Sequence, residues 1–548
     1  MGEFLSECAR AFLVTHHELS GSWRLRCLRQ VQARSLVAGV RVSGSRRGAR
    51  RMSSLVKPTL VLMSGRVLAF MATFFIPVVL ARLFDQTEFG IYKQLFLIFA
   101  TFYVIGQFGI AESLFYFLPQ ASHEPGRYVL NSLLVLAAAG LACLGLLTLT
   151  ASKIAQWMNT SALAEYIPWI GVFILLMIAS AVLEIVMTVR KRYLWAASTY
   201  AVSDLLRALL LVVPVLLFRR MEWLLLGAVV FASVRLCAAL LYLRYEFGGE
   251  LRPDPALLNK QLAYAFPYQM AVLVDVVQSN FHQYAVSYHF DAATFAIYAV
   301  GCLQIPLVDF LFTPASNVMM VRMSEEIRDG RSKAVLAIWH NTTRKLALVF
   351  FPLVGVLLVA ASDLIVVLFT ESYRDSVPIF MIWTTLTLLA ALQTDGFLRV
   401  YAETRFILLQ NAVRLLFIVA SITWFISTFQ LLGAVLVTAI AAVIGKGLAL
   451  ARIKSLLQVG LSQLLPWRGL AGIFIAAAAA GLPALMVESA LDVAKLPLLV
   501  ITSVVYTASY LILVFRGNLL TEDERRACTA WVQRFTAGAT KAGALLRS

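Results

Sequence analysis

The sequence predicts an all-α polytopic membrane protein with about fourteen transmembrane helices. Of its 548 residues, 60% are hydrophobic and only 14% are charged, and the mean hydropathy is +0.80. Soluble domains contain roughly 45–50% apolar and about 25% charged residues. Apolar runs of about 20 residues, the length that crosses a bilayer core of roughly 30 Å, recur along most of the chain. These features exclude a protein built from several soluble domains.

Residues 1–51 precede the first long apolar run and differ from the rest of the chain. They contain ten arginines, three glutamates and no lysine. Their apolar stretch at 11–14 is too short for a secretory signal. We expect this Arg-rich extension to lie outside the fold and Met52 to be the natural start. A transit peptide and an N-myristoylation site are the alternatives.

The apolar runs after residue 51 divide into fourteen predicted helices. They cover residues 59–81, 92–118, 128–149, 166–188, 199–218, 223–243, 263–288, 294–321, 345–362, 376–398, 405–426, 430–450, 469–487 and 496–515. Six helices form an N-lobe (52–243), a linker follows (244–262), and six more form a C-lobe (263–450). The last two lie in 451–515, and the tail 516–548 is predicted to be an amphipathic helix on the membrane surface.

The distribution of positive charge predicts the orientation in the membrane. An even number of helices places both termini on one side. The loops on that side, counted with the first two residues of each following helix, carry 18 Lys and Arg residues, and the opposite loops, counted in the same way, carry 7. The positive-inside rule therefore predicts that both termini are cytoplasmic. This asymmetry also accounts for most of the net charge of +17 without nucleic-acid binding.

An internal repeat relates the two predicted lobes. Residues 84–92 and 290–298 share the pattern F-D-x-x-x-F-x-I-Y at a constant offset of 206. Six predicted helices separate the two copies, so both halves have the same topology and a pseudo-two-fold axis along the membrane normal. Transporters built from such repeats bind substrate between halves that rock about the site. The outward loops are too short to hold a folded domain, so activity is expected among the helices.

Several short motifs resemble bacterial polysaccharide (O-antigen-type) flippases. In chain order they are SGRV at 64–67, LARL at 80–83, EFGIY at 88–92, FGIAES at 108–113, AFP at 265–267 and the segment 363–373. Thr370 stands where that family usually has glycine. The resemblance covers about 52–515, and the order of the motifs is more specific than any one of them.

The resemblance implies a fold and a function. The family belongs to the multidrug/oligosaccharidyl-lipid/polysaccharide exporter superfamily, which also contains lipid II flippases and multidrug/cation antiporters. It implies two six-helix lobes around a central cavity, followed by two extra helices. It also implies a non-enzymatic flippase of the bacterial inner (plasma) membrane. Such a protein moves undecaprenyl-pyrophosphate-linked sugar units to the periplasmic leaflet by alternating access, for surface polysaccharide biosynthesis. Polymerase machinery would be its partner.

Arginines inside the predicted helices are the candidates for binding the pyrophosphate. A charge near mid-bilayer costs roughly 2.5–3.5 kcal/mol, so each needs a partner or a task. A guanidinium binds phosphate oxygens in a bidentate manner without losing its proton. We therefore predict Arg66, Arg235 and Arg414 as headgroup-binding residues. Arg207 is a weaker candidate because Asp204 lies three residues before it on the same helix face.

Polar residues on the predicted seventh helix suggest a cavity wall or an ion-coupling site. Asp275, Gln278 and His282 are spaced i, i+3 and i+7 and share one helix face. A buried carboxylate or histidine there could exchange H⁺ or bind Na⁺ during rocking. Glu112 and Asp309 are further candidates for the cavity. Polar packing, for instance of Asp275 against an arginine, is the alternative.

Two other functions remain open from the sequence. A multidrug or organic-cation antiporter of the same superfamily would need acidic cavity residues, whereas arginines enter both predicted lobes. A membrane enzyme of polysaccharide assembly would need paired carboxylates or a metal site. The sequence contains neither these signals nor a nucleotide-binding glycine loop, so no cofactor, metal or catalytic residue is predicted.

Overall fold

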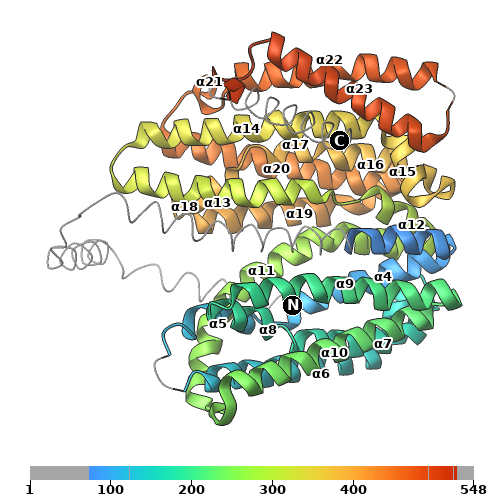
Figure 1. Cartoon of the computed structure of the whole chain (residues 1–548), viewed down its shortest axis with the longest axis vertical. Helices are drawn as coiled ribbons and strands as arrows, with labels where there is room; N and C mark the ends of the chain where they lie inside the picture. The colour runs from blue at the N-terminus through green and yellow to red at the C-terminus, as the bar shows by residue number, and fades with distance from the viewer. Residues whose placement is uncertain (1–72, 122–123, 492, 523, 527–548) are drawn as a thin grey trace, which may run out of the picture. The chain divides into compact units, whose positions relative to one another are not determined.

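The computed structural model describes residues 73–121, 124–491, 493–522 and 524–526, and the regular secondary structure of these residues is helical (Figure 1). All of them belong to one compact unit, Leu62–Ser548. The apolar helix Thr73–Leu83 opens the described part. The next helices are α4 (Gln86–Gly106), α5 (Ile110–Phe117), α6 (Gly126–Trp157), α7 (Leu163–Ala179), α8 (Val182–Val189), α9 (Tyr193–Phe218) and α10 (Met221–Phe247).

The remaining helices follow a short 3₁₀ turn, η1 (Gly248–Glu250). They are α11 (Pro255–His289), α12 (Ala292–Gly301), α13 (Pro306–Arg328), α14 (Ser332–Val359), α15 (Ala361–Phe369), η2 (Glu371–Ser376), α16 (Val377–Thr385), α17 (Thr387–Ala390), α18 (Thr394–Val400), α19 (Thr404–Phe429), α20 (Leu431–Leu457), α21 (Leu461–Leu464), α22 (Trp467–Ala490) and α23 (Lys495–Arg516).

The described residues confirm an all-α polytopic membrane protein. Eleven of their helical stretches are long and apolar enough to cross a membrane. The long helices α11 and α13, which overlap the predicted seventh and eighth spans, are not among the eleven because they are more polar. The count of fourteen and the two-lobe symmetry therefore remain predictions. Residues 1–72 and 527–548, which include most of the first predicted helix and most of the tail, lie outside the described residues.

Several predicted helices are interrupted, and the prediction of continuous helices was wrong there. The span 92–118 is divided into α4 and α5, because Phe108 and Gly109 between them have φ angles of 48° and 62°. The span 376–398 is divided into α16, α17 and α18, and Gln393 has a φ of 50°. Hydropathy averaged over about 20 residues is insensitive to one or two residues in the left-handed conformation.

The repeated motif has the same local role in both copies. Asp85 and Asp291 are the N-cap residues of α4 and α12, with φ and ψ of −71° and 173° and of −72° and 173°. Each carboxylate accepts a hydrogen bond from the backbone N–H three residues later, which satisfies a free donor at the helix start. The spacing shared by the two copies of the motif therefore encodes two equivalent helix starts.

Helices α4 and α12 pack closely against each other, although their motifs lie 206 residues apart. Gly90 makes this approach possible: a Cβ atom at this position would lie 1.8 Å from the carbonyl oxygen of Ala292. Phe89 and Phe295, the second phenylalanines of the two motifs, are fully buried. The two copies of the repeat thus meet in one hydrophobic core, which joins the two halves of the chain near the starts of both helices.

Ion pairs and hydrogen bonds between the helix connections agree with the predicted assignment of each loop to one side of the membrane. Four ion pairs join connections that are both predicted to be cytoplasmic: Arg127–Asp254, Arg190–Glu246, Arg344–Glu524 and Arg452–Glu403. The pair Lys495–Glu371 joins two connections that are both predicted to lie on the opposite side. Arg82 donates a hydrogen bond to the Leu368 carbonyl, and both residues are also predicted on that opposite side. Which side faces the cytoplasm remains a prediction.

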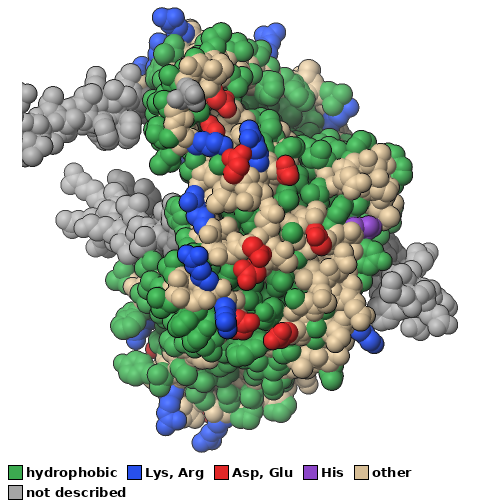
Figure 2. Space-filling view, turned by 90° about the vertical axis from the view of Figure 1, so that its right-hand side faces the viewer, with side chains coloured by type: hydrophobic (Ala, Val, Ile, Leu, Met, Phe, Trp, Pro, Cys, Tyr) green, Lys and Arg blue, Asp and Glu red, His purple; other side chains and the backbone are tan. Residues whose placement is uncertain are grey.

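The C-terminal helices α22 and α23 pack together beside α14 (Figure 1). Tyr506 of α23 donates to the Ala477 carbonyl at 2.7 Å, and Tyr510 donates to the Leu348 carbonyl at 2.9 Å. The end of α22 and the start of α23 are at the right in Figure 1, and Figure 2 views the molecule from that side. Acidic and basic side chains are interspersed on this face, without a large patch of one sign.

Candidate substrate site among the helices

Helix α11 lies between the first and second halves of the described chain (Figure 1). On one side, the Gln269 amide donates to the Val104 carbonyl at 3.1 Å, and Asn280 donates to the hydroxyl of Thr101 at 3.1 Å, both on α4. On the other side, α11 contacts α19 through Gln278. These hydrogen bonds explain the polarity of α11: its amide side chains face neighbouring helices of both halves rather than lipid.

Gln278 and Arg414 form the contact between α11 and α19. With the amide oriented by its partners, the Gln278 oxygen lies 2.9, 3.1 and 3.2 Å from Nη2, Nη1 and Nε of Arg414. The amide nitrogen donates to the Asn411 carbonyl at 3.3 Å. Gln278 is buried and Arg414 is half-buried. The guanidinium is thus held in place by a neutral group, which leaves its positive charge uncompensated by direct contact.

Helix α20 provides space for the Arg414 side chain through a glycine. A Cβ atom at Gly445 would lie 2.4 Å from Cδ of Arg414. Gly447, two residues later on the same helix, has no neighbour within 4 Å of such a Cβ. Any side chain at position 445 would therefore displace the guanidinium, whereas position 447 has no such constraint.

Further charged groups surround Arg414. Asp275 and Asp395 interact with it electrostatically, and so does Lys446. The Lys446 ammonium lies 2.8 Å from the Thr394 hydroxyl and 3.6 Å from a carboxylate oxygen of Asp395. No described carboxylate forms an ion pair with Arg414 itself. The second half therefore places one further cation and two carboxylates around a guanidinium that lacks a direct acidic partner.

The break before α18 contributes residues to this cluster that the sequence analysis missed. Gln393 is buried, and neither its amide oxygen nor its amide nitrogen has a hydrogen-bond partner among the described residues. Thr394 and Asp395 follow directly and contact Lys446. Interrupted membrane helices commonly supply such groups to substrate sites. Asp395 lies inside the predicted span 376–398, so its charge was a signal that could have identified it.

Arg235 lies in the first half and is already paired. Its guanidinium contacts Glu184 at 2.7 Å and also donates to the hydroxyls of Ser180 and Ser203 at 3.1 and 2.9 Å. The Glu184 side chain is 4% exposed and that of Arg235 is 13% exposed. Glu184 lies on α8, 51 residues before Arg235 in the chain. Arg235 therefore forms a buried interhelical ion pair.

Two other predicted residues of the first half lie near this pair. Arg207 forms the expected ion pair with Asp204 at 3.2 Å. Glu112 interacts electrostatically with Tyr103, as do Arg235 and Glu184, so these residues share one polar region. One carboxylate oxygen of Glu112 is buried and has no hydrogen-bond partner among the described residues. Arg66, the remaining candidate in this half, lies outside the described residues.

The other candidates on the polar helices face different surroundings. His282 is buried, and its Nδ1 lies 2.7 Å from the hydroxyl of Tyr298, so it does not share the surroundings of Gln278. Asp275 is exposed. Asp309 is also exposed and lines a separate cavity of about 280 Å³ together with Gln304 and Trp383. The structure thus brings Asp275, Gln278 and Arg414 together and places His282 and Asp309 elsewhere.

Comparison with known proteins finds a family match over part of the chain. Residues 55–325 match the family model described as polysaccharide biosynthesis protein. No curated protein matches the sequence. The resemblance noted on the sequence motifs is confirmed at the level of this family and of the superfamily fold.

Solved structures share the fold at low sequence identity. The lipid II flippase MurJ in an inward closed conformation superposes with a TM-score of 0.64 at 13% identity, covering 83% of this chain and 100% of MurJ. An inward-facing multidrug resistance MATE family transporter of the MOP superfamily superposes with a TM-score of 0.57 at 12% identity. The match covers 73% of this chain and 99% of that transporter. A mutant of the Vibrio cholerae MATE transporter VcmN superposes with a TM-score of 0.51 at 11% identity. The match covers 75% of this chain and 98% of VcmN. The chain therefore has the fold of these membrane transporters.

Proposed function

Since residues 55–325 belong to the polysaccharide biosynthesis protein family, we propose that this chain is a flippase for lipid-linked oligosaccharides. It moves undecaprenyl-pyrophosphate-linked sugar units from the cytoplasmic to the periplasmic leaflet of the bacterial inner membrane, with both termini cytoplasmic. The polymerase that joins these units would act after it. The similarity of the fold to MurJ supports the transport of a lipid rather than catalysis.

The observation that carries this proposal is the environment of Arg414. A pyrophosphate must leave water to cross the membrane, and a guanidinium can bind two of its oxygens at once. Arg414 is oriented by the amide of Gln278 and forms no ion pair with a described carboxylate, so its charge can be matched by the substrate. Arg235 and Arg207 each have a carboxylate partner and are less suited to this role.

The packing of the repeated motifs supports alternating access. The contact of α4 with α12 at Gly90 and Ala292 joins the two halves at the side predicted to be external. Rocking of the halves would separate this contact and would move α11, which bonds to α4 and α19. The carboxylates of Asp275 and Asp309 are the proposed sites for coupling this motion to H⁺ or Na⁺.

Antiport of organic cations is the second candidate function. The exposed carboxylate of Asp309, which lines a cavity and forms no ion pair in the described part of the chain, would suit a cationic substrate. The fold similarity to a MATE transporter fits this function as well. The two candidates differ in the sign of the charge that the cavity must bind.

Reconstitution into proteoliposomes tests the proposal. A fluorescent undecaprenyl-pyrophosphate-linked sugar is placed in the bilayer, and the fraction protected from an external quencher is followed with and without H⁺ or Na⁺ gradients. Charged hydrogen bonds are worth about 1.5–3 kcal/mol, so Arg414→Gln should slow flipping by about ten-fold to a hundred-fold. Arg414→Lys should recover part of the rate, because it keeps the charge but loses the bidentate geometry.

Arg405→Gln is the matched control, because Arg405 is an exposed arginine on the same helix, α19. It should flip at the wild-type rate. The same vesicles, loaded with a cationic dye, report antiport. Transport of the dye without flipping of the lipid-linked sugar would refute the flippase proposal and support the antiporter.

A further inference from the structure

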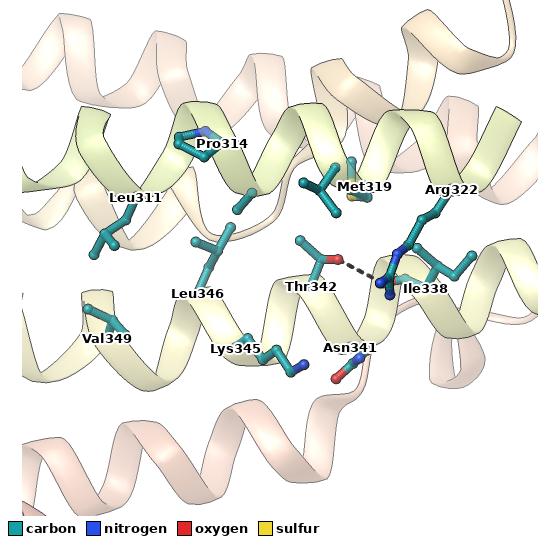
Figure 3. Close-up of a pocket in the computed structure, with 12 residues that line it drawn as sticks. Leu311, Pro314, Met319, Arg322, Ile338, Asn341, Thr342, Lys345, Leu346 and Val349 are labelled. Carbon is teal, nitrogen blue, oxygen red and sulfur yellow. Dashed lines mark hydrogen bonds between the residues drawn. The ribbon is translucent and has the colours of Figure 1, made fainter. Parts of the chain in front are cut away.

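A second cavity lies between α13 and α14, and none of its lining residues belongs to the cluster around Arg414 (Figure 3). Its volume is about 500 Å³, within the range of roughly 300–1,000 Å³ found for small-molecule sites. Pro314 of α13 lies on its wall. A proline inside a helix removes a backbone hydrogen bond and disturbs the regular packing of that helix against its neighbour. The cavity is therefore a feature of how these two helices meet.

The cavity is polar at one end and apolar at the other. Figure 3 shows Arg322 and Asn341 toward one end, Lys345 near the middle with its side chain directed toward Asn341, and Leu311 and Val349 at the opposite end. Arg322 lies near the C-terminal end of α13, which is on the predicted cytoplasmic side. The apolar end lies further from that side along both helices. A ligand with a polar head and an apolar chain, aligned along the helices, would match this division.

The two cations in this cavity lack acidic partners, unlike other cations nearby. Arg331 pairs with Glu326 and Asp329, and Arg344 pairs with Glu524. Neither Arg322 nor Lys345 forms an ion pair with any described residue, and both are exposed. The lining contains no carboxylate. The polar end is therefore complementary to an anion.

We propose that this cavity binds an anionic phospholipid of the cytoplasmic leaflet. Arg322 and Lys345 bind its phosphate, Asn341 and Thr342 line the head region, and one acyl chain runs between the helices toward Leu311 and Val349. Basic pockets between membrane helices on the cytoplasmic side recognise such headgroups. The lining has no aromatic residue on which a sugar ring could stack, which favours a phospholipid over a sugar-bearing lipid.

Native mass spectrometry of the full chain in detergent tests this site, with phosphatidylglycerol as the probe and phosphatidylcholine as the zwitterionic control. Wild-type protein should bind phosphatidylglycerol more tightly. The double variant Arg322→Gln/Lys345→Gln should lose about thirty-fold in affinity, equivalent to about 2 kcal/mol for two lost charge contacts. The control variant Arg328→Gln/Lys333→Gln removes the same charge from the same pair of helices but outside the cavity lining, and should bind normally.

A third variant separates the shape of the cavity from its charge. Val318 lines the cavity and is 56% exposed, so Val318→Trp should be tolerated by the fold while filling the space for the chain. It should weaken phosphatidylglycerol binding without changing any charge. Binding is measured without transport, so failure of the flippase proposal would leave this result intact.

Three outcomes would overturn the assignment. The first is equal binding of phosphatidylglycerol to the wild type and to Arg322→Gln/Lys345→Gln. The second is equal affinity of the wild type for phosphatidylglycerol and phosphatidylcholine. The third is displacement of phosphatidylglycerol by undecaprenyl phosphate at equal or lower concentration, which would assign the cavity to the lipid carrier.

Discussion

The buried ion pair between Arg235 and Glu184 allows a structural role to be separated from substrate binding. Glu184→Gln leaves the guanidinium, whose side chain is 13% exposed, without its counter-ion. Removing one partner of a buried pair destabilises a protein by about 3–5 kcal/mol, because an uncompensated charge stays buried. The hydroxyls of Ser180 and Ser203 remain bonded to the arginine, which places the expected loss near the lower value.

The double variant Arg235→Met/Glu184→Leu should behave differently from either single change. Replacing a whole buried pair by apolar groups is often neutral or stabilising, because both desolvation penalties disappear. We therefore expect its free energy of unfolding, measured by denaturant titration in detergent, to return to near the wild-type value. As a control, Arg374→Met disrupts the exposed pair with Glu371 and should change stability by at most about 1 kcal/mol.

Flipping by the double variant decides the function of Arg235. If the arginine is structural, the stable double variant flips the lipid-linked sugar at close to the wild-type rate. A stable, inserted double variant whose flipping falls at least as far as that of Arg414→Gln would refute this reasoning. It would return Arg235 to the headgroup-binding residues predicted from the sequence.

Other changes give equally specific expectations. Gly445→Ala should slow flipping by displacing the adjacent guanidinium, whereas Gly447→Ala should not; equal rates in the proteoliposome assay would contradict this geometry. Gly90→Ala forces a Cβ atom against a backbone carbonyl and should destabilise the chain by about 1–3 kcal/mol. Its control, Gly145→Ala, has open space and should be neutral in the same denaturant titration. Hydrogen bonds from backbone N–H groups, together with an arginine, lower the pKa of the Asp254 carboxyl. The ionised carboxylate therefore stabilises the fold fully above the ordinary carboxyl pKa. This stabilisation is lost as the pH falls through the lowered pKa. Asp254→Asn should therefore reduce the thermal midpoint at pH 7 and flatten its fall on acidification; an unchanged slope would show that this carboxylate is not responsible.

Much of the architecture could be predicted from the sequence, because a bilayer imposes its length scale on the chain. The apolar runs predicted an all-α membrane protein, and the repeated F-D-x-x-x-F-x-I-Y motif marked two equivalent helix starts. Local chemistry determines both: about 20 apolar residues span the bilayer, and an aspartate caps the helix that follows it. The breaks at Phe108–Gly109 and at Gln393 were missed, since one or two left-handed residues barely change the average hydropathy.

The sequence identified charged residues in the predicted helices, but only the tertiary structure decided how they pair. Arg235 and Arg414 look equivalent in the sequence, since each lies near the middle of an apolar helix. In the fold, Arg235 meets a carboxylate that is 51 residues away along the chain, and Arg414 meets the amide of Gln278. Whether a buried charge is neutralised depends on contacts over a few ångströms between helices distant in sequence. Helix packing therefore determines which arginine can bind an anion.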